Sequence, residues 1–328
     1  MPSPRPALLI WNPASGGRRY ADRIPEIRAI LHAHGFDLTV APTTEPGHAT
    51  ALAADACRRG GCDVIFGLGG DGTLREIAVA LLGTAVPLAI LPGGTTNVLA
   101  LALGIPAHPV KAATLYRAAP PAGRLDQGGA PSLDVRALDV GIARPMGVGR
   151  CGDGAAIPFL MMVTVGVDSE ILRRVSQHAK RRFGRLAVAA QALAALKTYG
   201  SPTHTLVAGE RRAAGTFIAA SNIRYYGGPF EITPRADPLD GRLDFAVFAG
   251  RGRLAMLELA LDVLTGTHRS RADFASWQGT SARIEGEGEV WVQIDGDPMR
   301  LALPVEIALA PERVGILQPS SPGLTRRA

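Results

Sequence analysis

Residues 63–76 read DVIFGLGGDGTLRE, an apolar run that leads into a glycine-rich turn and then into a helical pattern. The apolar residues at 64–68 are typical of a buried parallel strand, and residues 74–82 space their apolar side chains as a helix does. Glycines around Asp71 allow a sharp turn that leaves backbone N–H groups at a helix N-terminus, where phosphate oxygens are favoured. A polyphosphate repels a carboxylate unless a divalent metal ion or a transferable proton lies between them. The stretch therefore predicts a phosphate site that contains an acidic residue.

Two other interpretations of this stretch remain open. Gly67, Gly69 and Gly72 match the GxGxxG dinucleotide fingerprint, but the next strand ends without the acidic residue that would hold a ribose. Alternatively, Thr73 and Glu76 form a capping box and the glycines serve only the turn. A residue that caps the helix can still border a site.

Composition indicates a globular protein with room for two domains. The chain has 328 residues, of which 47% are hydrophobic and 20% charged. Its net charge of +6 suits a nucleic acid, an anionic membrane surface or a phosphorylated ligand. No aromatic or helix-turn-helix arrangement accompanies the charge, so we do not expect a nucleic-acid partner.

The cysteines and apolar tracts predict a cytoplasmic protein. Cys57, Cys62 and Cys151 have neither a disulfide-framework spacing nor histidines at metal-ligand distances, so we expect reduced thiols. The apolar run at 7–11 is too short for a secretory signal. A glycine and a proline interrupt the longest apolar tract, 77–91, so we expect no membrane-spanning helix. Any membrane contact would be peripheral, at the inner membrane surface.

Strand and helix patterns alternate through residues 1–122 and predict an α/β nucleotide-binding domain, with a parallel sheet covered by helices on both faces. Four turns each follow a strand and precede a helix, at residues 12–17, 43–47, 69–73 and 92–97. A parallel sheet brings such turns to its carboxyl edge, where open α/β sheets bind ligands. Three of the turns are rich in glycine, and several carry hydroxyls or amides that suit phosphate and ribose.

The second half has a different character. Residues 123–134 are rich in glycine and proline and are predicted to form a linker. Short β-rich runs bounded by turns dominate residues 135–318, which predicts an antiparallel sandwich or barrel-like β-rich domain with helices near 168–199 and 252–264. Residues 319–328 are expected to form a disordered tail.

Seven motifs follow one another through residues 8–317. They are Asn12-Pro13-x-Ser15-Gly16, Gly69-Gly70-Asp71-Gly72-Thr73, Gly94-Thr95-Thr96-Asn97, Val165-Gly166-Val167-Asp168, Ser221-Asn222-x-x-Tyr225-Tyr226-Gly227-Gly228, Pro234-x-Ala236-x-x-x-Asp240-Gly241-x-Leu243-Asp244 and Val292-Gln293-Ile294-Asp295-Gly296-Asp297-Pro298. Together they resemble the diacylglycerol kinase catalytic-domain family, which includes diacylglycerol, sphingosine and ceramide kinases and soluble bacterial lipid kinases. NAD kinases and phosphofructokinases share the glycine–aspartate motif, whereas the ordered set is specific.

The resemblance implies transfer of the γ-phosphate of ATP, with Mg²⁺, to the hydroxyl of a lipid such as diacylglycerol or a sphingoid lipid, in a cleft between the two domains. It implies catalytic roles for Asp71, Asp295 and Asp297, with Asp71 and Asp295 as metal ligands. It also implies a structural metal site at Asp240 and Asp244. The residues expected to bind the nucleotide are Asn12, Ser15, Gly16, Thr44, Gly69, Gly70, Gly72, Thr73, Gly94, Thr95 and Asn97.

Alternatives to these roles remain open. Asp295 and Gly296 also form a common hairpin-turn pair, and Asp240 also fits a solvated turn. Val98 stands where many relatives have aspartate, and Asp297 where many have glutamate, which keeps a non-catalytic lipid- or nucleotide-binding homologue as an alternative. An NAD kinase fits the glycine–aspartate loop but leaves the second-half motifs unexplained.

Residues 173–196 combine a basic run with an apolar helix at 186–196. The basic residues are Arg173, Arg174, Lys180, Arg181, Arg182 and Arg185. One interpretation is docking on anionic lipid, because each basic residue near such a surface contributes about 1 kcal/mol. The other is a solvated helix face with an opposite side that packs in the core.

Overall fold

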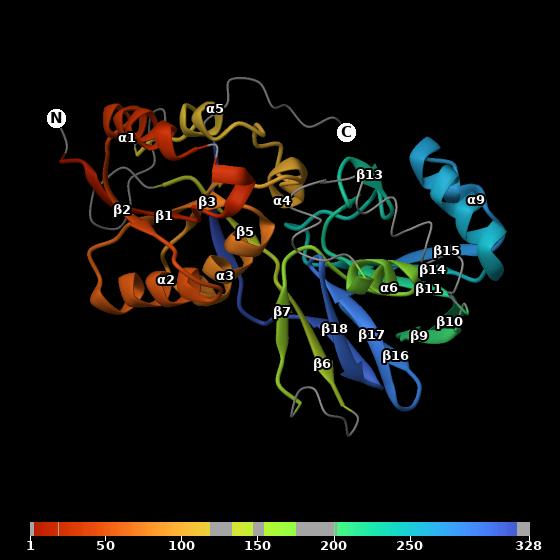
Figure 1. Cartoon of the computed structure of the whole chain (residues 1–328). Coiled ribbons are helices and arrows are strands. Elements are labelled where there is room, and N and C mark those ends of the chain that lie inside the picture. The colour runs from red at the N-terminus through yellow and green to blue at the C-terminus, as the bar shows by residue number, and fades with distance from the viewer. Residues whose placement is uncertain are drawn as a thin grey trace. The chain divides into compact units, whose positions relative to one another are not determined.

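The computed structural model describes residues 3–18, 20–118, 133–146, 154–174, 200 and 202–319 (Figure 1). The chain divides into two compact units, Met1–Leu138 with Glu312–Ala328, and Asp139–Pro311.

The first unit contains a six-stranded sheet in the order β2-β1-β3-β4-β20-β5. The strands are β1 (Arg5–Trp11), β2 (Phe36–Pro42), β3 (Val64–Gly69), β4 (Leu88–Pro92), β5 (Val135–Leu138) and β20 (Val314–Leu317). All neighbouring pairs are parallel except β20 and β5. Every residue of the central strand β3 is buried. Burial on both faces explains why its sequence is a continuous apolar run without alternation.

Helices cover both faces of this sheet. They are the 3₁₀ turns η1 (Ser15–Arg18) and η2 (Ala21–Arg23), and the helices α1 (Ile24–Ala33), α2 (His48–Arg59), α3 (Asp71–Leu81), α4 (Val98–Ala102) and α5 (Pro109–Ala113). Figure 1 shows α1 and α5 on one face and α2 and α3 on the other. The α/β domain with a largely parallel sheet is therefore present as predicted.

The last two strands of this sheet, β20 and β5, differ from the expected division of the chain. We expected residues 135–318 in the second domain, but β5 and β20 pair with each other in the sheet of the first unit. A four-residue apolar run has the same pattern whichever sheet it joins, so its distant pairing partner decides its place. Most of the predicted linker lies outside the described residues, as do residues 175–199, residues 320–328 and Cys151.

The second unit is an antiparallel sandwich-like β domain. One sheet has the order β10-β9-β16-β19-β6-β7 and the other β15-β14-β11-β8-β17-β18. The first consists of β6 (Gly141–Pro145), β7 (Ile157–Phe159), β9 (His204–Ala208), β10 (Arg211–Gly215), β16 (Ser281–Glu285) and β19 (Val305–Leu309). The second consists of β8 (Met162–Val165), β11 (Phe217–Ser221), β14 (Leu243–Phe248), β15 (Phe274–Gly279), β17 (Glu289–Ile294) and β18 (Asp297–Ala302). Side chains from both sheets form one apolar core.

A second apolar cluster lies on the outer face of the sheet that contains β11 and β14. Phe217 and Phe248 of this face pack with Met256 and Leu259 of α9 (Gly252–Thr265). The remaining elements of the unit are α6 (Val167–Arg174), η3 (His268–Ser270) and the ribbon of β12 (Tyr225–Tyr226) and β13 (Phe230–Glu231). Among the described residues, no helix combines the length and apolar character needed to span a bilayer.

The Tyr116 hydroxyl completes the hydrogen bonding of β4. The register of β4 and β20 has a single pair, Leu88 with Ile316. Two residues further along β4, the Tyr116 hydroxyl accepts a hydrogen bond from the Ile90 N–H at 3.1 Å and donates one to the Ile90 carbonyl at 3.0 Å. Tyr116 is fully buried, and burial raises the pKa of its hydroxyl. A side chain thus replaces the missing strand neighbour.

Replacing Tyr116 with phenylalanine should therefore destabilise the first unit. Tyr116→Phe leaves both peptide groups of Ile90 without this partner, and we expect a loss of about 2–4 kcal/mol in the free energy of unfolding, measured by chemical denaturation. Tyr20→Phe, which alters a half-buried ring in the same unit, should cost less than about 1 kcal/mol. Equal effects of the two substitutions would contradict this role.

Candidate functional site

Three of the four predicted turns converge at the carboxyl edge of the first sheet. A Cβ added at Gly94 would lie 2.6 Å from the Cα of Gly70, so the turns after β3 and β4 touch through their glycines. Gly16 has a φ of +60°, and an added Cβ would collide with the carbonyl oxygen of Gly93. Side chains at Gly16 and Gly94 would separate these turns.

Asp71 joins the start of α3 to the start of α4. Its Oδ1 accepts a hydrogen bond from the Leu99 N–H at 3.1 Å. Its Oδ2 accepts from the Val98 N–H at 3.1 Å and from the Thr96 hydroxyl at 3.2 Å. The carboxylate thus satisfies two N–H groups that a helix leaves without an internal partner. Asp71 holds the turn after β4 in place.

The environment of Asp71 acts on its pKa in two directions. Burial raises the pKa of the carboxyl above its usual range, and the hydrogen bonds from Leu99, Val98 and Thr96 oppose that rise. A half-buried carboxyl with a raised pKa is better suited to accept a proton than an exposed one.

Hydrogen bonds between residues of the turn after β4 also stabilise that turn. Asn97 has a φ of 49°, and its side chain accepts a hydrogen bond from the Gly94 N–H at 2.8 Å and donates one to the Gly94 carbonyl at 3.1 Å. Asparagine tolerates this left-handed conformation better than most residues. Thr95 lies at the exposed tip of the turn.

The turn after β1 contacts the start of α3. Asn12 donates from Nδ2 to the Thr73 hydroxyl at 2.9 Å and accepts at Oδ1 from the Ala14 N–H at 2.9 Å. The Ser15 hydroxyl lies beside Gly70, 3.3 Å from where a Cβ on that glycine would be. Asn12, Ser15 and Thr73 thus lie together, as the sequence predicted.

Gly69 and Gly72 have opposite surroundings. A Cβ on Gly69 would lie 2.6 Å from the Cβ of Thr73, so the fold itself requires glycine at that position. A Cβ on Gly72, at the second position of α3, would meet nothing within 4 Å in the part of the chain that the structure describes, and Gly72 is exposed. Packing therefore accounts for Gly69 but not for Gly72.

The capping-box interpretation of Thr73 and Glu76 is wrong. Helix α3 begins at Asp71 with Gly70 as its N-cap, three residues earlier than that interpretation needs. Glu76 instead accepts a hydrogen bond from the Ala49 N–H at 3.2 Å, near the start of α2. In the turn before α2, Thr44 directs both its N–H and its hydroxyl to Nδ1 of His48, at 3.1 Å and 2.9 Å.

In the second unit, Asp295 is bonded to the backbone. Its carboxylate accepts hydrogen bonds from the N–H groups of Leu160, Met161 and Met162 at 2.8, 2.9 and 3.0 Å. Asp295 and Gly296 have φ values of 50° and 89° and form the turn between β17 and β18. The hairpin alternative is therefore correct for this pair, and the carboxylate also positions a neighbouring loop. Asp297 follows the turn as an exposed residue.

Asp240 and Asp244 lie in an acidic region that includes a carboxylate we did not select. Asp240 accepts from the Arg242 N–H at 2.9 Å, and Asp244 from the Gln278 amide at 2.9 Å. Asp139 is buried and accepts from the Gly241 N–H at 2.6 Å. The pKa of Asp240 is raised, mainly by burial and further by neighbouring carboxylates that include Asp139. Within the described ranges, no group of three or more His, Cys, Asp or Glu side chains is arranged to hold a metal ion.

Arg173 and Arg174, the described residues of the predicted lipid-docking segment, form ion pairs with an acidic residue. Glu170 binds Arg173 and Arg174, each at 2.6 Å, and these bonds lower the pKa of its carboxyl. The other basic residues of that segment lie outside the described residues.

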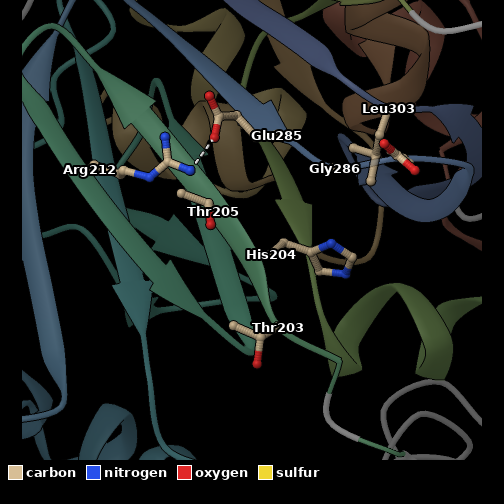
Figure 2. A pocket seen from close by; sticks show the side chains of 8 residues that line it. Thr203, His204, Thr205, Arg212, Glu285, Gly286 and Leu303 are labelled. Carbon is tan, nitrogen blue, oxygen red and sulfur yellow. Dashed lines mark ion pairs between the residues drawn. The ribbon is translucent and has the colours of Figure 1, made fainter.

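None of the four turns lines either of two surface hollows in the described parts of the chain. One lies on α1 and β2. The other, in the second unit, includes His204 and the ion pair of Arg212 with Glu285 at 2.7 Å (Figure 2). Burial lowers the pKa of His204. The converging glycine turns of the first unit therefore remain the candidate site.

Comparison with known proteins identifies the family. Residues 6–122 match the model of the diacylglycerol kinase catalytic domain, and residues 161–318 match the YegS C-terminal NAD kinase beta sandwich-like domain. A Pseudomonas syringae pv. syringae protein named "Probable lipid kinase YegS-like" is 30% identical over 295 residues, covering 86% of this chain and 87% of the relative. The chain belongs to the diacylglycerol kinase catalytic-domain family.

Other members of this kinase family agree in length and fold. A Mycobacterium tuberculosis protein named "Diacylglycerol kinase" is 27% identical over 318 residues, covering 94% of each chain. The crystal structure of a "putative diacylglycerol kinase" from Bacillus anthracis str. Sterne has a TM-score of 0.74 at 24% identity, covering 98% of this chain and 97% of that one. At this identity the likeness shows the fold alone.

The sequence analysis missed three side chains that organise the sites of this kinase-family chain. They are Thr96, Glu76 as a partner of α2, and Asp139. Thr96 directly precedes the asparagine before α4, where hydroxyl side chains commonly bond to helix starts, so its position carried a usable signal. The partners of Glu76 and Asp139 are 27 and 102 residues away, and local pattern does not show them.

Removing the Asp71 carboxylate should loosen the turn that it holds. In Asp71→Ala the Val98 and Leu99 N–H groups lose their acceptor, and we expect their hydrogen exchange to become about 30-fold faster, equivalent to about 2 kcal/mol. Amide-resolved hydrogen exchange measures this effect. Thr95→Ala, at the exposed tip of the same turn, should leave both rates unchanged. Unaltered exchange in Asp71→Ala would show that the carboxylate does not hold the turn.

Proposed function

We propose that this chain is an ATP- and Mg²⁺-dependent lipid kinase that transfers the γ-phosphate of ATP to a lipid hydroxyl. Diacylglycerol and sphingoid lipids are the proposed substrate class, which places the enzyme in lipid metabolism and phospholipid biosynthesis. The observation that carries the proposal is the open space at Gly72, bordered by converging turns that end in backbone N–H groups.

The space at Gly72 has no explanation in the fold. Glycine within a helix costs up to about 1 kcal/mol relative to alanine, and no neighbouring atom of the described residues excludes a side chain there. Gly72 also lies in the first turn of α3, where N–H groups favour an anion. A nucleotide phosphate that approaches the backbone closely accounts for both features.

The neighbouring residues suit the rest of a nucleotide. We propose that residues 70–73 contact the phosphates, that Gly16, Gly69 and Gly94 shape the turns, and that Asn12 and Thr44 lie beside the nucleotide. Ser15, Thr95 and Asn97 would complete the pocket. Hydroxyls and amides of this kind bind ribose and phosphate by hydrogen bonds without adding negative charge.

The acidic residues fit Mg²⁺ only if phosphates share its coordination. Oδ1 of Asp71 accepts a single hydrogen bond from the described groups, which leaves it able to contact a cation. Mg²⁺ is usually held by one or two carboxylates together with substrate phosphates, where it neutralises charge that develops during phosphoryl transfer. We propose Asp71 as this ligand, and we keep Asp240 and Asp244 as a proposed structural metal site.

The roles of the second-unit carboxylates follow from their contacts. Asp295 already accepts three N–H bonds, so we propose that it acts chiefly by positioning residues 160–162. Asp297 is exposed beside that turn and is the proposed second acidic residue, as a proton acceptor or metal contact. Asp71, whose carboxyl has a raised pKa, is the first proposed acidic residue.

NAD kinase is the second candidate. The model matched by residues 161–318 describes an NAD kinase beta sandwich-like domain, and the glycine–aspartate motif fits the same activity. We rank it below a lipid kinase because the relatives that match most of this chain are named lipid or diacylglycerol kinases.

A transfer assay separates these candidates. With γ-labelled ATP and Mg²⁺, we expect label on a lipid from a panel of diacylglycerol, sphingoid base, ceramide and phosphatidylglycerol, and none on NAD. Chelation of the metal should abolish transfer, and Asp71→Asn should lower kcat/KM at least about 100-fold while nucleotide binding is retained. Asp37→Asn, an exposed substitution on β2, is the control and should be fully active. Label on NAD alone would establish the second candidate, and nucleotide binding without any transfer would establish a non-catalytic homologue.

Gly72 supplies an independent test of where the phosphates bind. Gly72→Ala should leave the melting temperature unchanged or slightly raised, because alanine favours helix, yet weaken ATP binding about tenfold by filling the open space. Titration calorimetry with Mg²⁺ and ATP measures the affinity. Gly200→Ala is the matched control, since a Cβ at Gly200 also meets nothing within 4 Å. Wild-type ATP affinity in Gly72→Ala would place the phosphates elsewhere.

A further inference from the structure

Helix α9 exposes a row of leucines to solvent. Leu254, Leu257, Leu261 and Leu264 are 77%, 45%, 54% and 57% exposed. Their spacing of three, four and three residues places them on one side of the helix, in a stripe about 15 Å long. Single exposed leucines are ordinary, but a continuous stripe of four marks an interaction surface.

Among the described residues of the second unit, the four leucines of the stripe belong to neither apolar cluster. The opposite side of α9 contributes Met256 and Leu259 to the apolar cluster on the outer face of the sheet, and both are buried. That contact already gives the helix its apolar partner. The outer leucines therefore point to a partner outside the unit.

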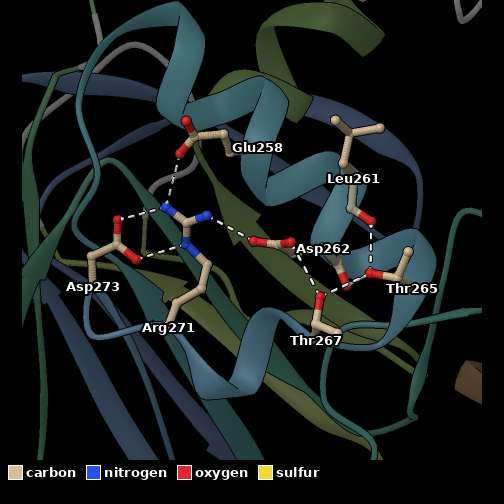
Figure 3. A network of polar contacts seen from close by, with 7 residues as sticks. All are labelled: Glu258, Leu261, Asp262, Thr265, Thr267, Arg271 and Asp273. Atoms are coloured by element: carbon tan, nitrogen blue, oxygen red, sulfur yellow. Dashed lines mark hydrogen bonds and ion pairs between the residues drawn. The ribbon is translucent and has the colours of Figure 1, made fainter.

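Both acidic residues of α9 are paired with an arginine. Its two carboxylates, Glu258 and Asp262, bind Arg271 at 3.3 and 2.7 Å, and Arg271 also binds Asp273 at 2.8 Å (Figure 3). Arg271 lowers the pKa of Asp262 and of Asp273. It also lies over the ring of Phe248, whose side chain is in the outer-face cluster. Arg271 thus offsets the charge of both carboxylates, including Glu258, which is exposed and lies four residues from Leu254 on the same helix.

Exposed arginines lie at both ends of the stripe. Arg251 and Arg253 are at the start of α9, and Arg269 follows its end. If two copies of α9 paired through their leucines, arginines would meet arginines at the helix ends in the parallel and in the antiparallel orientation. An anionic lipid surface accepts arginines at both ends, while the leucines enter the interface between headgroups and acyl chains. The charge distribution therefore favours lipid over a second copy.

We propose that the leucine stripe of α9 docks on the surface of an anionic lipid bilayer and holds the kinase on the membrane. This docking role rests on the proposed function, because a lipid kinase would find its substrate in the same membrane. It moves the docking surface to α9 from the segment 173–196, whose first two arginines are paired with Glu170.

Binding of the full chain to vesicles tests the proposal without nucleotide or catalysis. The vesicles are phosphatidylcholine with about one third phosphatidylglycerol, and the readout is the partition coefficient from co-sedimentation. We expect Leu254→Gln with Leu261→Gln to lower the coefficient at least about tenfold, because two large apolar side chains lose their transfer from water. Met146→Gln is the matched control, since Met146, directly after β6, is 52% exposed, and it should bind as the wild type. Wild-type binding by the leucine double variant would overturn the proposal.

Three further readouts sharpen the test. Arg251→Glu with Arg269→Glu should lower binding to the anionic vesicles at least about fivefold and leave binding to pure phosphatidylcholine unchanged. Tryptophan fluorescence of Leu257→Trp should be quenched by brominated lipid, and an absence of quenching would overturn the proposal. A dimer in sedimentation velocity that the leucine variant dissociates, with vesicle binding unaltered, would overturn it in favour of a second copy.

The failure of this proposal and the failure of the proposed function give different results. If no lipid is phosphorylated but the leucine variant loses vesicle binding, docking stands and the kinase assignment fails. If the variant phosphorylates vesicle-borne and short-chain monomeric lipid as the wild type does and binds vesicles equally, the kinase stands and docking through α9 fails. The expected result is loss of activity on vesicles with full activity on the monomeric lipid. Circular dichroism should show unchanged folding, because the substituted leucines are solvent-exposed.

Discussion

The carboxylate of Asp71 joins two helix starts, and the geometry of the glycine turns depends on that joint. Its acceptor oxygens hold the N–H groups of Val98 and Leu99, so the turn after β4 cannot move independently of the turn after β3. The contact of Gly70 with Gly94 then brings the two backbones together without side chains between them. Asp71, which its motif marks as a catalytic candidate, therefore also holds the backbone of the two turns in place. Its structural and chemical effects can be separated only by measuring loop order and phosphoryl transfer on the same variants.

The second unit uses carboxylates in the same way. Asp295 gathers three consecutive N–H groups, and Asp139 accepts the N–H of Gly241. In each case a buried or partly buried loop gains a charged acceptor in place of water, which makes a stronger hydrogen bond than a neutral group would. This explains why aspartates recur in the motifs of this chain without forming a cage of metal ligands among the described residues.

Local pattern predicted the elements around the candidate site well. The strand at β3, the helices α2 and α3 and the positions of the turns all follow from apolar spacing and glycine, which act over a few residues. The missed features depend on distant partners. Val98 is 27 residues from Asp71, and Leu160 is 135 residues from Asp295. Likewise, β5 and β20 are joined by pairing across most of the chain, and their short apolar runs carry no information about which sheet they enter.

Asp168 shows that a motif residue can be retained at a cost in stability. Burial raises the pKa of Asp168 and of Tyr226, while the hydroxyls of Thr164 and Tyr226 favour the ionised carboxylate. An acid whose pKa is higher in the folded chain contributes stability below its ordinary pKa of about 4 and loses it as the pH rises through the folded value. Above that ordinary pKa, burial of the carboxyl therefore opposes folding, and the two hydroxyls offset part of that cost. An apolar side chain would avoid that cost, whereas the hydrogen bond from the Thr164 hydroxyl to Asp168 ties the start of α6 to β8.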